Sequence, residues 1–322
     1  RRPFDRITVL EAKCLAEGPA GRNSGFMIDL PHDLASKDYG GRIQEDRKKI
    51  EQNRLAINFA RKTVNDLGLP REAFQEVGKV NAAATTTGMQ HNLNYKDHLA
   101  DLKENFELYD AQQMTELTGT TYYLGGLFTP GTVMLQPALY IRELGKKLIS
   151  NKLKIHENSP VISLAHNGFD WHAKTPKGSI TTQKIIMATN GHVENFGLFK
   201  RRIIHLFTYG SMTRGLTPEE SKILGGKAHW GLTSADPLGT TVRKISTISG
   251  DRIVIRNKVT YEPEMQPTQA VLNRIYAKHT TSFEARFPNL KDGQMAFNWG
   301  GQLAFSLNNV PAFGEAEKGL FT

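Results

Sequence analysis

The feature that most constrains the fold is a short apolar run that ends in an acid. The run covers residues 6–11 and ends at Glu11, and a loop of small residues follows at 17–25. A short β-branched and apolar run is typical of a buried parallel strand. A second run of this kind, at 184–189, ends at Asn190 and Gly191. Because parallel strands need crossover connections, the pattern predicts an α/β fold.

The rest of the chain alternates between helical and extended patterns. Apolar spacing predicts helices at 45–67, 89–106, 137–150 and 268–287, with short helices starting at Asp110 and Thr217. β-branched or alternating runs predict strands at 74–87, 122–128, 153–156, 161–165, 169–175, 203–213, 240–247, 252–256, 295–299 and 302–305. The sequence therefore predicts an α/β region with an added antiparallel sheet, α+β overall.

Composition and charge exclude several classes of protein. The 322 residues are 39% hydrophobic and 23% charged, as in ordinary globular proteins. No stretch approaches the roughly 20 apolar residues of a membrane span. The net charge is +9, but the basic residues are spread out, so we do not expect a nucleic-acid partner. The single cysteine, Cys14, allows no internal disulfide and favours a reducing, cytoplasmic location.

The search for catalytic motifs is largely negative. The sequence has no G-x-G-x-x-G, no P-loop, no G-x-S-x-G elbow, and no H-E-x-x-H or C-x-x-C pair. We therefore expect no metal site. Glu11 remains, because an acid at a strand end hydrogen-bonds the adenosine ribose in dinucleotide-binding folds. A solvated carboxylate is the ordinary alternative for this residue.

Glu11 together with the loop 21–25 resembles the flavin-dependent amine oxidoreductases of the D-amino acid oxidase superfamily. The branch is that of glycine oxidase, sarcosine oxidase and γ-glutamylputrescine oxidase. The segments 123–128, 136–137, 159–164, 184–191, 299–301 and 309–314 extend the resemblance in the same order along the chain. The resemblance implies that FAD is bound by Glu11, Gly21, Arg22, Asn23, Ser24, Gly25, Val161, Ala188, Thr189, Asn190, Gly191 and Gly300.

The same resemblance implies two interleaved domains. A Rossmann-like FAD-binding domain would comprise 1–73, 130–202 and 294–322, and an antiparallel-sheet substrate domain would comprise 74–129 and 203–293. Members of the family also have a glycine-rich turn before the ribose-binding acid and a flavin-facing helix near their end. Neither is recognisable here, so we expect a chain truncated at both ends that holds FAD poorly or not at all.

The activity implied is oxidation of a primary or secondary amine or an amino acid. Hydride passes from the carbon beside the nitrogen to flavin N5, and water hydrolyses the resulting imine. The family chemistry requires no dedicated general base, so we assign no catalytic residue. The candidates for contact with the small-molecule substrate are Tyr209, Arg243, Arg256 and Trp299. Their alternatives are a half-buried strand tyrosine, surface arginines and a core tryptophan.

Two other functions stay open. A flavin enzyme that tailors a tRNA base would use the positive charge as a backbone-binding surface. A flavin-free remnant would act as a non-catalytic binding protein.

Overall fold

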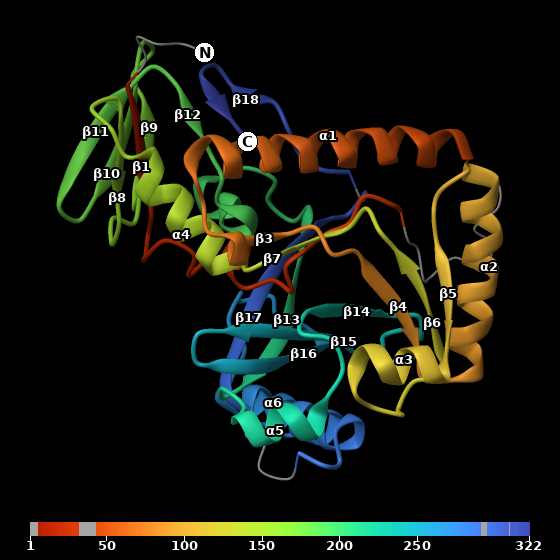
Figure 1. Ribbon diagram of the computed structural model, residues 1–322. Helices are drawn as coiled ribbons and strands as arrows, with labels where there is room; N and C mark the ends of the chain where they lie inside the picture. The colour runs from red at the N-terminus through yellow and green to blue at the C-terminus, as the bar shows by residue number, and fades with distance from the viewer. Residues whose placement is uncertain (1–5, 32–42, 291–294, 309) are drawn as a thin grey trace.

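The computed structural model describes residues 6–31, 43–290, 295–308 and 310–322. Figure 1 shows a large sheet in the lower half of the molecule and a group of short strands above it, with helix α1 crossing the top. The helices are α1 Ile43–Leu67, α2 Thr86–Leu102, α3 Ala111–Thr118, α4 Pro137–Leu148, α5 Pro218–Leu224 and α6 Gln269–Arg286, with 3-10 turns η1 Pro19–Gly21, η2 Arg71–Ala73 and η3 Asn190–Phe196.

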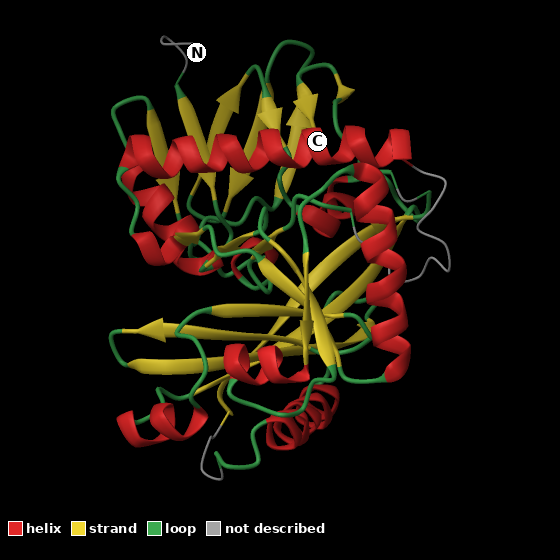
Figure 2. Cartoon of the chain, turned by 45° about the vertical axis from the view of Figure 1, so that its right-hand side comes forward, coloured by secondary structure: helices red, strands yellow, loops and turns green. Residues whose placement is uncertain are grey.

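The large sheet has eight strands in the order β17-β13-β16-β15-β14-β4-β6-β5. Their bounds are β4 Lys79–Ala83, β5 Glu107–Asp110, β6 Gly125–Thr129, β13 Ile203–Thr213, β14 Trp230–Ser234, β15 Thr241–Thr247, β16 Gly250–Tyr261 and β17 Met295–Ser306. All neighbours are antiparallel except β14 and β4. The main apolar core includes Val80, Leu232, Val242, Ile255 and Phe283, so it lies between one face of this sheet and α6. Helices α5 and α6, labelled in Figure 1, lie below the sheet, and Figure 2 shows helices below the sheet from a second side.

The short strands form four smaller groups. They are β1 Ile7–Leu10 with β8 Leu153–His156; β9 Ser163–His166, β10 Trp171–Thr175 and β11 Gly178–Thr182; β12 Ile185–Ile186, β18 Glu315–Glu317 and β19 Leu320–Phe321; and β2 Phe26–Met27, β3 Phe74–Gln75 and β7 Val133–Leu135. The pairs β1–β8 and β12–β19 are parallel, which confirms the prediction of parallel strands at 6–11 and 184–189. Their predicted burial is not found among the described residues, because Ile7 is 53% and Ile186 is 78% exposed.

Local signals located most helices correctly. Asp110 and Thr217 each close a capping box, with Gln113 and Glu220, at the starts of α3 and α5. Pro137 is the first residue of α4, as predicted.

Two strand predictions are wrong in their boundaries. The run 74–87 is divided at Gly78 (φ +70°) into β3 and β4, which belong to different sheets, and α2 already begins at Thr86. The two strands expected at 295–305 are one strand, β17. Gly300 and Gly301 do not interrupt it, because β13 pairs with it along its length.

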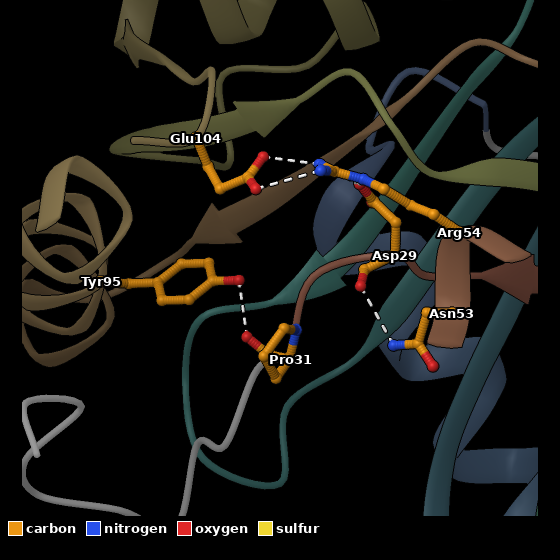
Figure 3. A network of polar contacts seen from close by, with 6 residues as sticks. All are labelled: Asp29, Pro31, Asn53, Arg54, Tyr95 and Glu104. Carbon is orange, nitrogen blue, oxygen red and sulfur yellow. Dashed lines mark hydrogen bonds and ion pairs between the residues drawn. The ribbon is translucent and has the colours of Figure 1, made fainter. Parts of the chain in front are cut away.

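A polar network joins α1 to α2 (Figure 3). It lies beside a second apolar cluster, which consists of Leu30, Ile50, Tyr95, Leu99, Leu102 and Leu127. Arg54 on α1 bonds Asp29 at 3.1 Å and Glu104, after α2, at 2.5 Å. The Tyr95 hydroxyl donates to the carbonyl of Pro31 at 2.8 Å. These bonds fix the chain that leaves β2 against both helices.

Among the described residues, no helix is long and apolar enough to cross a membrane. Strand β17 lies in the segment predicted for the cofactor domain, 294–322, yet it pairs with β13 in the large sheet. The division into two interleaved domains stays a prediction.

Candidate functional site

The predicted cofactor loop is a tight turn whose backbone explains its residue types. A Cβ on Gly21 would collide with the carbonyl of Ala16, so a larger residue does not fit there. The Asn23 amide donates to the carbonyl of Ala20 at 2.7 Å, and its oxygen accepts from the backbone N–H of Gly25 at 2.7 Å. These are turn-stabilising bonds of the kind asparagine forms. Gly25 has φ +75°, a conformation that favours glycine.

The loop lies directly on strand β17. The indole N–H of Trp299 donates to the carbonyl of Arg22 at 3.1 Å, and Arg22 Nη1 donates back to the carbonyl of Gly300 at 3.5 Å. A Cβ on Gly301 would come within 3.1 Å of the Arg22 carbonyl. The two glycines therefore matter as a surface on which the loop packs.

Arg243 on β15 clamps the other end of the loop. Its Nη1 donates to the carbonyls of Ser24 at 2.6 Å and Leu135 at 2.8 Å, and the guanidinium lies 5.4 Å from the ring centre of Phe26. The residue is 4% exposed, and this burial lowers its pKa to about 10. A contact of Arg243 with a substrate carboxylate stays a prediction. In the structure the side chain holds the loop through its hydrogen bonds to the two carbonyls.

Arg256 on β16 differs from Arg243 in having no hydrogen-bond partner in the described part of the chain. It is half-buried, opposite Gly210 on β13 and Thr241 on β15, and burial lowers its pKa. The neighbouring Ile255 belongs to the core on the α6 side. Because side chains alternate along a strand, Arg256 faces the other side of the sheet.

Trp299 lies on that same face. A Cβ on Gly210 would come within 2.5 Å of its indole, so the ring covers this glycine. Since Gly210 is opposite Arg256, the structure brings Trp299, Arg256 and the cofactor loop to one face of the sheet.

Tyr209 lies on the opposite face. Ser211, two residues along β13, bonds His279 of α6 at 2.7 Å, so Tyr209 also faces the helix side. Its hydroxyl is 2.6 Å from the Thr260 hydroxyl, and burial raises its pKa. Its role as a substrate wall stays a prediction.

Glu11 directly follows β1, and its backbone N–H donates to the carbonyl of His156, the last residue of β8, at 2.9 Å. Its Oε1 accepts the backbone N–H of Lys13 at 2.9 Å, and its carbonyl accepts the N–H of Ser159 at 2.8 Å. The segment leading to Val161 therefore runs beside the predicted ribose-binding acid. Oε2 has no bond to the described residues, so it is available to a hydroxyl donor.

The turn 188–191 is held by residues that sequence reasoning did not single out as a group. The Asn190 amide donates to the carbonyl of Gln302 at 3.3 Å, and a Cβ on Gly191 would come within 2.7 Å of the His205 ring. His205 in turn bonds Glu194 of η3 at 2.6 Å and Gln302 at 3.3 Å. No sequence motif predicts this cluster, because its residues are far apart in the sequence and come into contact only in the folded chain.

The described residues fit an FAD site by two observations. The buried hydroxyl of Thr189 has no hydrogen-bond partner among the described residues, so a donor or acceptor from a ligand would satisfy it. A cavity of about 530 Å³ lies next to the same turn, with Met187, Asn190 and Ala304 in its lining, and Thr189 itself is outside that lining. Ala188, the first residue of this turn, is exposed.

Comparison with known proteins shows the class to which this chain belongs. The chain belongs to the FAD dependent oxidoreductase (DAO) family, whose model matches residues 1–322. This confirms the predicted family and its cofactor class, while poor retention of FAD by this chain stays a prediction.

Three proteins illustrate the similarity. The probable oxidoreductase OrdL of Haemophilus influenzae is 25% identical over 223 residues, which cover 66% of this chain and 47% of that protein. The alignment thus spans about half the length of that relative. Glycine oxidase from Geobacillus kaustophilus has a TM-score of 0.74 at 13% identity, covering 98% of this chain and 81% of that chain. L-α-Glycerophosphate oxidase from Mycoplasma pneumoniae, with FAD bound, has a TM-score of 0.70 at 14% identity, covering 98% and 82%. These structures support the predicted α/β fold.

Proposed function

We propose that this chain belongs to an enzyme that oxidises a primary or secondary amine or an amino acid, and that it contributes residues to the cofactor and substrate sites. When bound, FAD supplies the acceptor for the hydride that leaves the carbon beside nitrogen, and water hydrolyses the imine. The observation that carries the proposal is a half-buried Arg256, without a hydrogen-bond partner in the described chain, on the face of the sheet that holds Trp299 and the loop 21–25.

The role we assign to Arg256 is to bind a substrate carboxylate. A guanidinium offers two parallel N–H donors to a carboxylate, and such charge-assisted bonds are stronger than neutral ones. Because the guanidinium is partly desolvated and has no partner among the residues that the structure describes, a bound anion would recover the interaction that burial removes. The indole of Trp299 and the backbone of the loop 21–25 would then orient the substrate carbon against the cofactor.

The alternative to amine oxidation is oxidation of an alcohol, and the names of two structural neighbours illustrate both reactions. One is an oxidase of glycine, and another is an oxidase of glycerophosphate, an alcohol. Their identities to this chain are 13% and 14%, so they support the fold and leave the donor bond to be tested.

The test mixes the FAD-loaded enzyme anaerobically with a panel of amino acids, simple amines and glycerol 3-phosphate, and follows bleaching of the flavin absorbance. We expect bleaching by at least one amine, with release of ammonia or a smaller amine. Bleaching by glycerol 3-phosphate and by none of the amines would refute the proposal.

Arg256→Met tests the carboxylate contact separately. We expect KM for carboxylate-bearing amines to rise at least about tenfold, with KM for amines that lack a carboxylate unchanged. Arg252→Met is the matched control, because Arg252 lies on the same strand but donates to the carbonyl of Thr213 and packs on Phe297. An equal rise in KM for both substrate groups would contradict the assignment.

A further inference from the structure

A second cavity, of about 470 Å³, lies on the other face of the large sheet, between the interior strands β4, β14 and β16 and helix α6. Its lining includes Ala82 of β4, Ser234 at the end of β14, Asn257 of β16 and Ser282 of α6. Ala82 belongs to the core cluster on the α6 side, and Arg256 faces away from that side. The cavity is therefore separate from the candidate amine site. Its volume is within the range of small-molecule sites.

The cavity holds a buried arginine that the surrounding residues fix in place. Arg286 is 6% exposed, and its guanidinium carbon lies 4.4 Å from the ring centre of Tyr122. Nε donates to the Tyr123 hydroxyl at 3.2 Å, and Nη1 donates to the carbonyl and the hydroxyl of Ser282. Nη2 has no partner in the described chain. A rigid guanidinium with one free nitrogen is a preorganised donor.

A β-bulge adds two further polar groups. Tyr209 pairs with Asn257 and Thr208 pairs with Val259, so Lys258, at φ +65°, is left unpaired between them. A bulge breaks the alternation of side chains. As a result, the neighbours Asn257 and Lys258 both line the cavity, whereas in a regular strand they would face opposite sides. The side-chain oxygen of Asn257 is buried without a hydrogen-bond partner in the structure described.

The charges in the lining are unbalanced. Three cationic side chains, Arg286, Lys258 and Lys278, stand against one carboxylate, Asp236. Both oxygens of Asp236 are already occupied, one by the backbone N–H of Ala84 at 2.9 Å and the other by the hydroxyl of Thr85. Neither lysine forms an ion pair with the residues that the structure describes.

We propose that this cavity binds a small ligand through an oxyanion, a carboxylate or a phosphate, at a site separate from the amine site. Arg286 Nη2 and the two lysine ammonium groups donate to the oxyanion. The unpaired oxygen of Asn257 accepts from a hydroxyl or N–H of the same ligand. The proposal does not depend on the proposed amine oxidation.

The experiment is calorimetric titration of the purified chain, at fixed ionic strength in sodium chloride, with inorganic phosphate and separately with glutarate. We expect saturable binding of at least one probe, with the stronger probe identifying the oxyanion. In the double variant Lys258→Gln/Lys278→Gln the affinity should fall at least about tenfold, since charge-assisted hydrogen bonds are lost.

The matched control is Lys222→Gln/Lys227→Gln, which removes the same charge at exposed positions outside the lining. Its affinity should remain within about twofold of the unsubstituted chain. The unfolding midpoints of both variants are measured alongside, and both should match the parent because all four lysines are exposed. Absence of saturable binding for both probes, or equal weakening in the control, would overturn the proposal.

Discussion

The buried lysine of strand β4 leads to a sharp prediction about stability and pH. Lys79 is 1% exposed, and its ammonium group lies against the side-chain oxygen of Asn81 and 3.3 Å from the Thr233 hydroxyl. Burial lowers the pKa of Lys79 from 10.5 to about 7. The negative charge of Asp29 opposes this decrease but is too weak to cancel it. The folded protein therefore binds this proton less tightly than the unfolded chain does.

The direction of the pH dependence follows from this difference. Between pH 7 and 10.5 the unfolded chain carries the proton and the folded protein largely does not, so stability rises with pH across this window. The difference of about 3.5 pH units corresponds to about 5 kcal/mol over the full window, and to about 3 kcal/mol between pH 6.5 and 9.5.

Lys79→Met removes the titrating group and keeps the shape of the side chain. The side-chain oxygen of Asn81 keeps a donor, because the Thr233 hydroxyl bonds it at 2.7 Å. We therefore expect the variant to be more stable than the parent at pH 6.5 by several kcal/mol, with the gap closing by about 3 kcal/mol at pH 9.5.

Urea unfolding followed by tryptophan fluorescence at pH 6.5, 8 and 9.5 measures this gap. Lys177→Met is the control, because Lys177 is exposed and its loss should leave the pH dependence of the parent. A constant difference between parent and Lys79→Met across the three pH values would refute the reasoning.

The other predictions concern the cofactor loop and the turn at 188–191. Gly25→Ala places a Cβ against Arg243 and the Leu135 carbonyl at φ +75°, so we expect a loss of more than about 2 kcal/mol in thermal unfolding and weaker FAD binding. Gly68→Ala, at φ +61° with no atom near the added Cβ, should lower the free energy of unfolding by only about 1 kcal/mol. Equal losses of stability in Gly25→Ala and Gly68→Ala would contradict the steric argument. Glu194→Gln should cost about 1–3 kcal/mol in urea and raise the FAD dissociation constant, because His205 loses a charged partner. Glu143→Gln, which breaks only a pair with Lys146 near the surface, should cost less than about 1 kcal/mol, and a similar cost in both would argue against a special role for Glu194.

Some residues of the candidate site can be predicted from a sequence motif, and others cannot. The loop 21–25 is predictable, because its turn depends on glycines and on Asn23 bonding its own neighbours. Arg243 was singled out for a substrate, yet its nearest observed partners are carbonyls such as that of Ser24, 219 residues away. No local pattern encodes a contact of that separation.

The cluster of His205, Glu194 and Gln302 shows the same limit. Each residue is ordinary in its own segment, and the strands β13 and β17 bring them together. The same holds for the cavity beside α6, where the bulge at Lys258 in β16 places this residue in the same lining as Arg286.

The sequence by itself determined the features that depend on neighbours along the chain. These are the capping boxes at Asp110 and Thr217, the start of α4 at Pro137, and the order of motifs that identified the flavoprotein family. Tertiary structure alone decided that Lys79 is buried, that Arg256 is left without a partner in the described chain, and that β17 is continuous. The physical reason is that caps and turns are satisfied within a few residues, whereas burial and charge pairing depend on which distant strands and helices pack together.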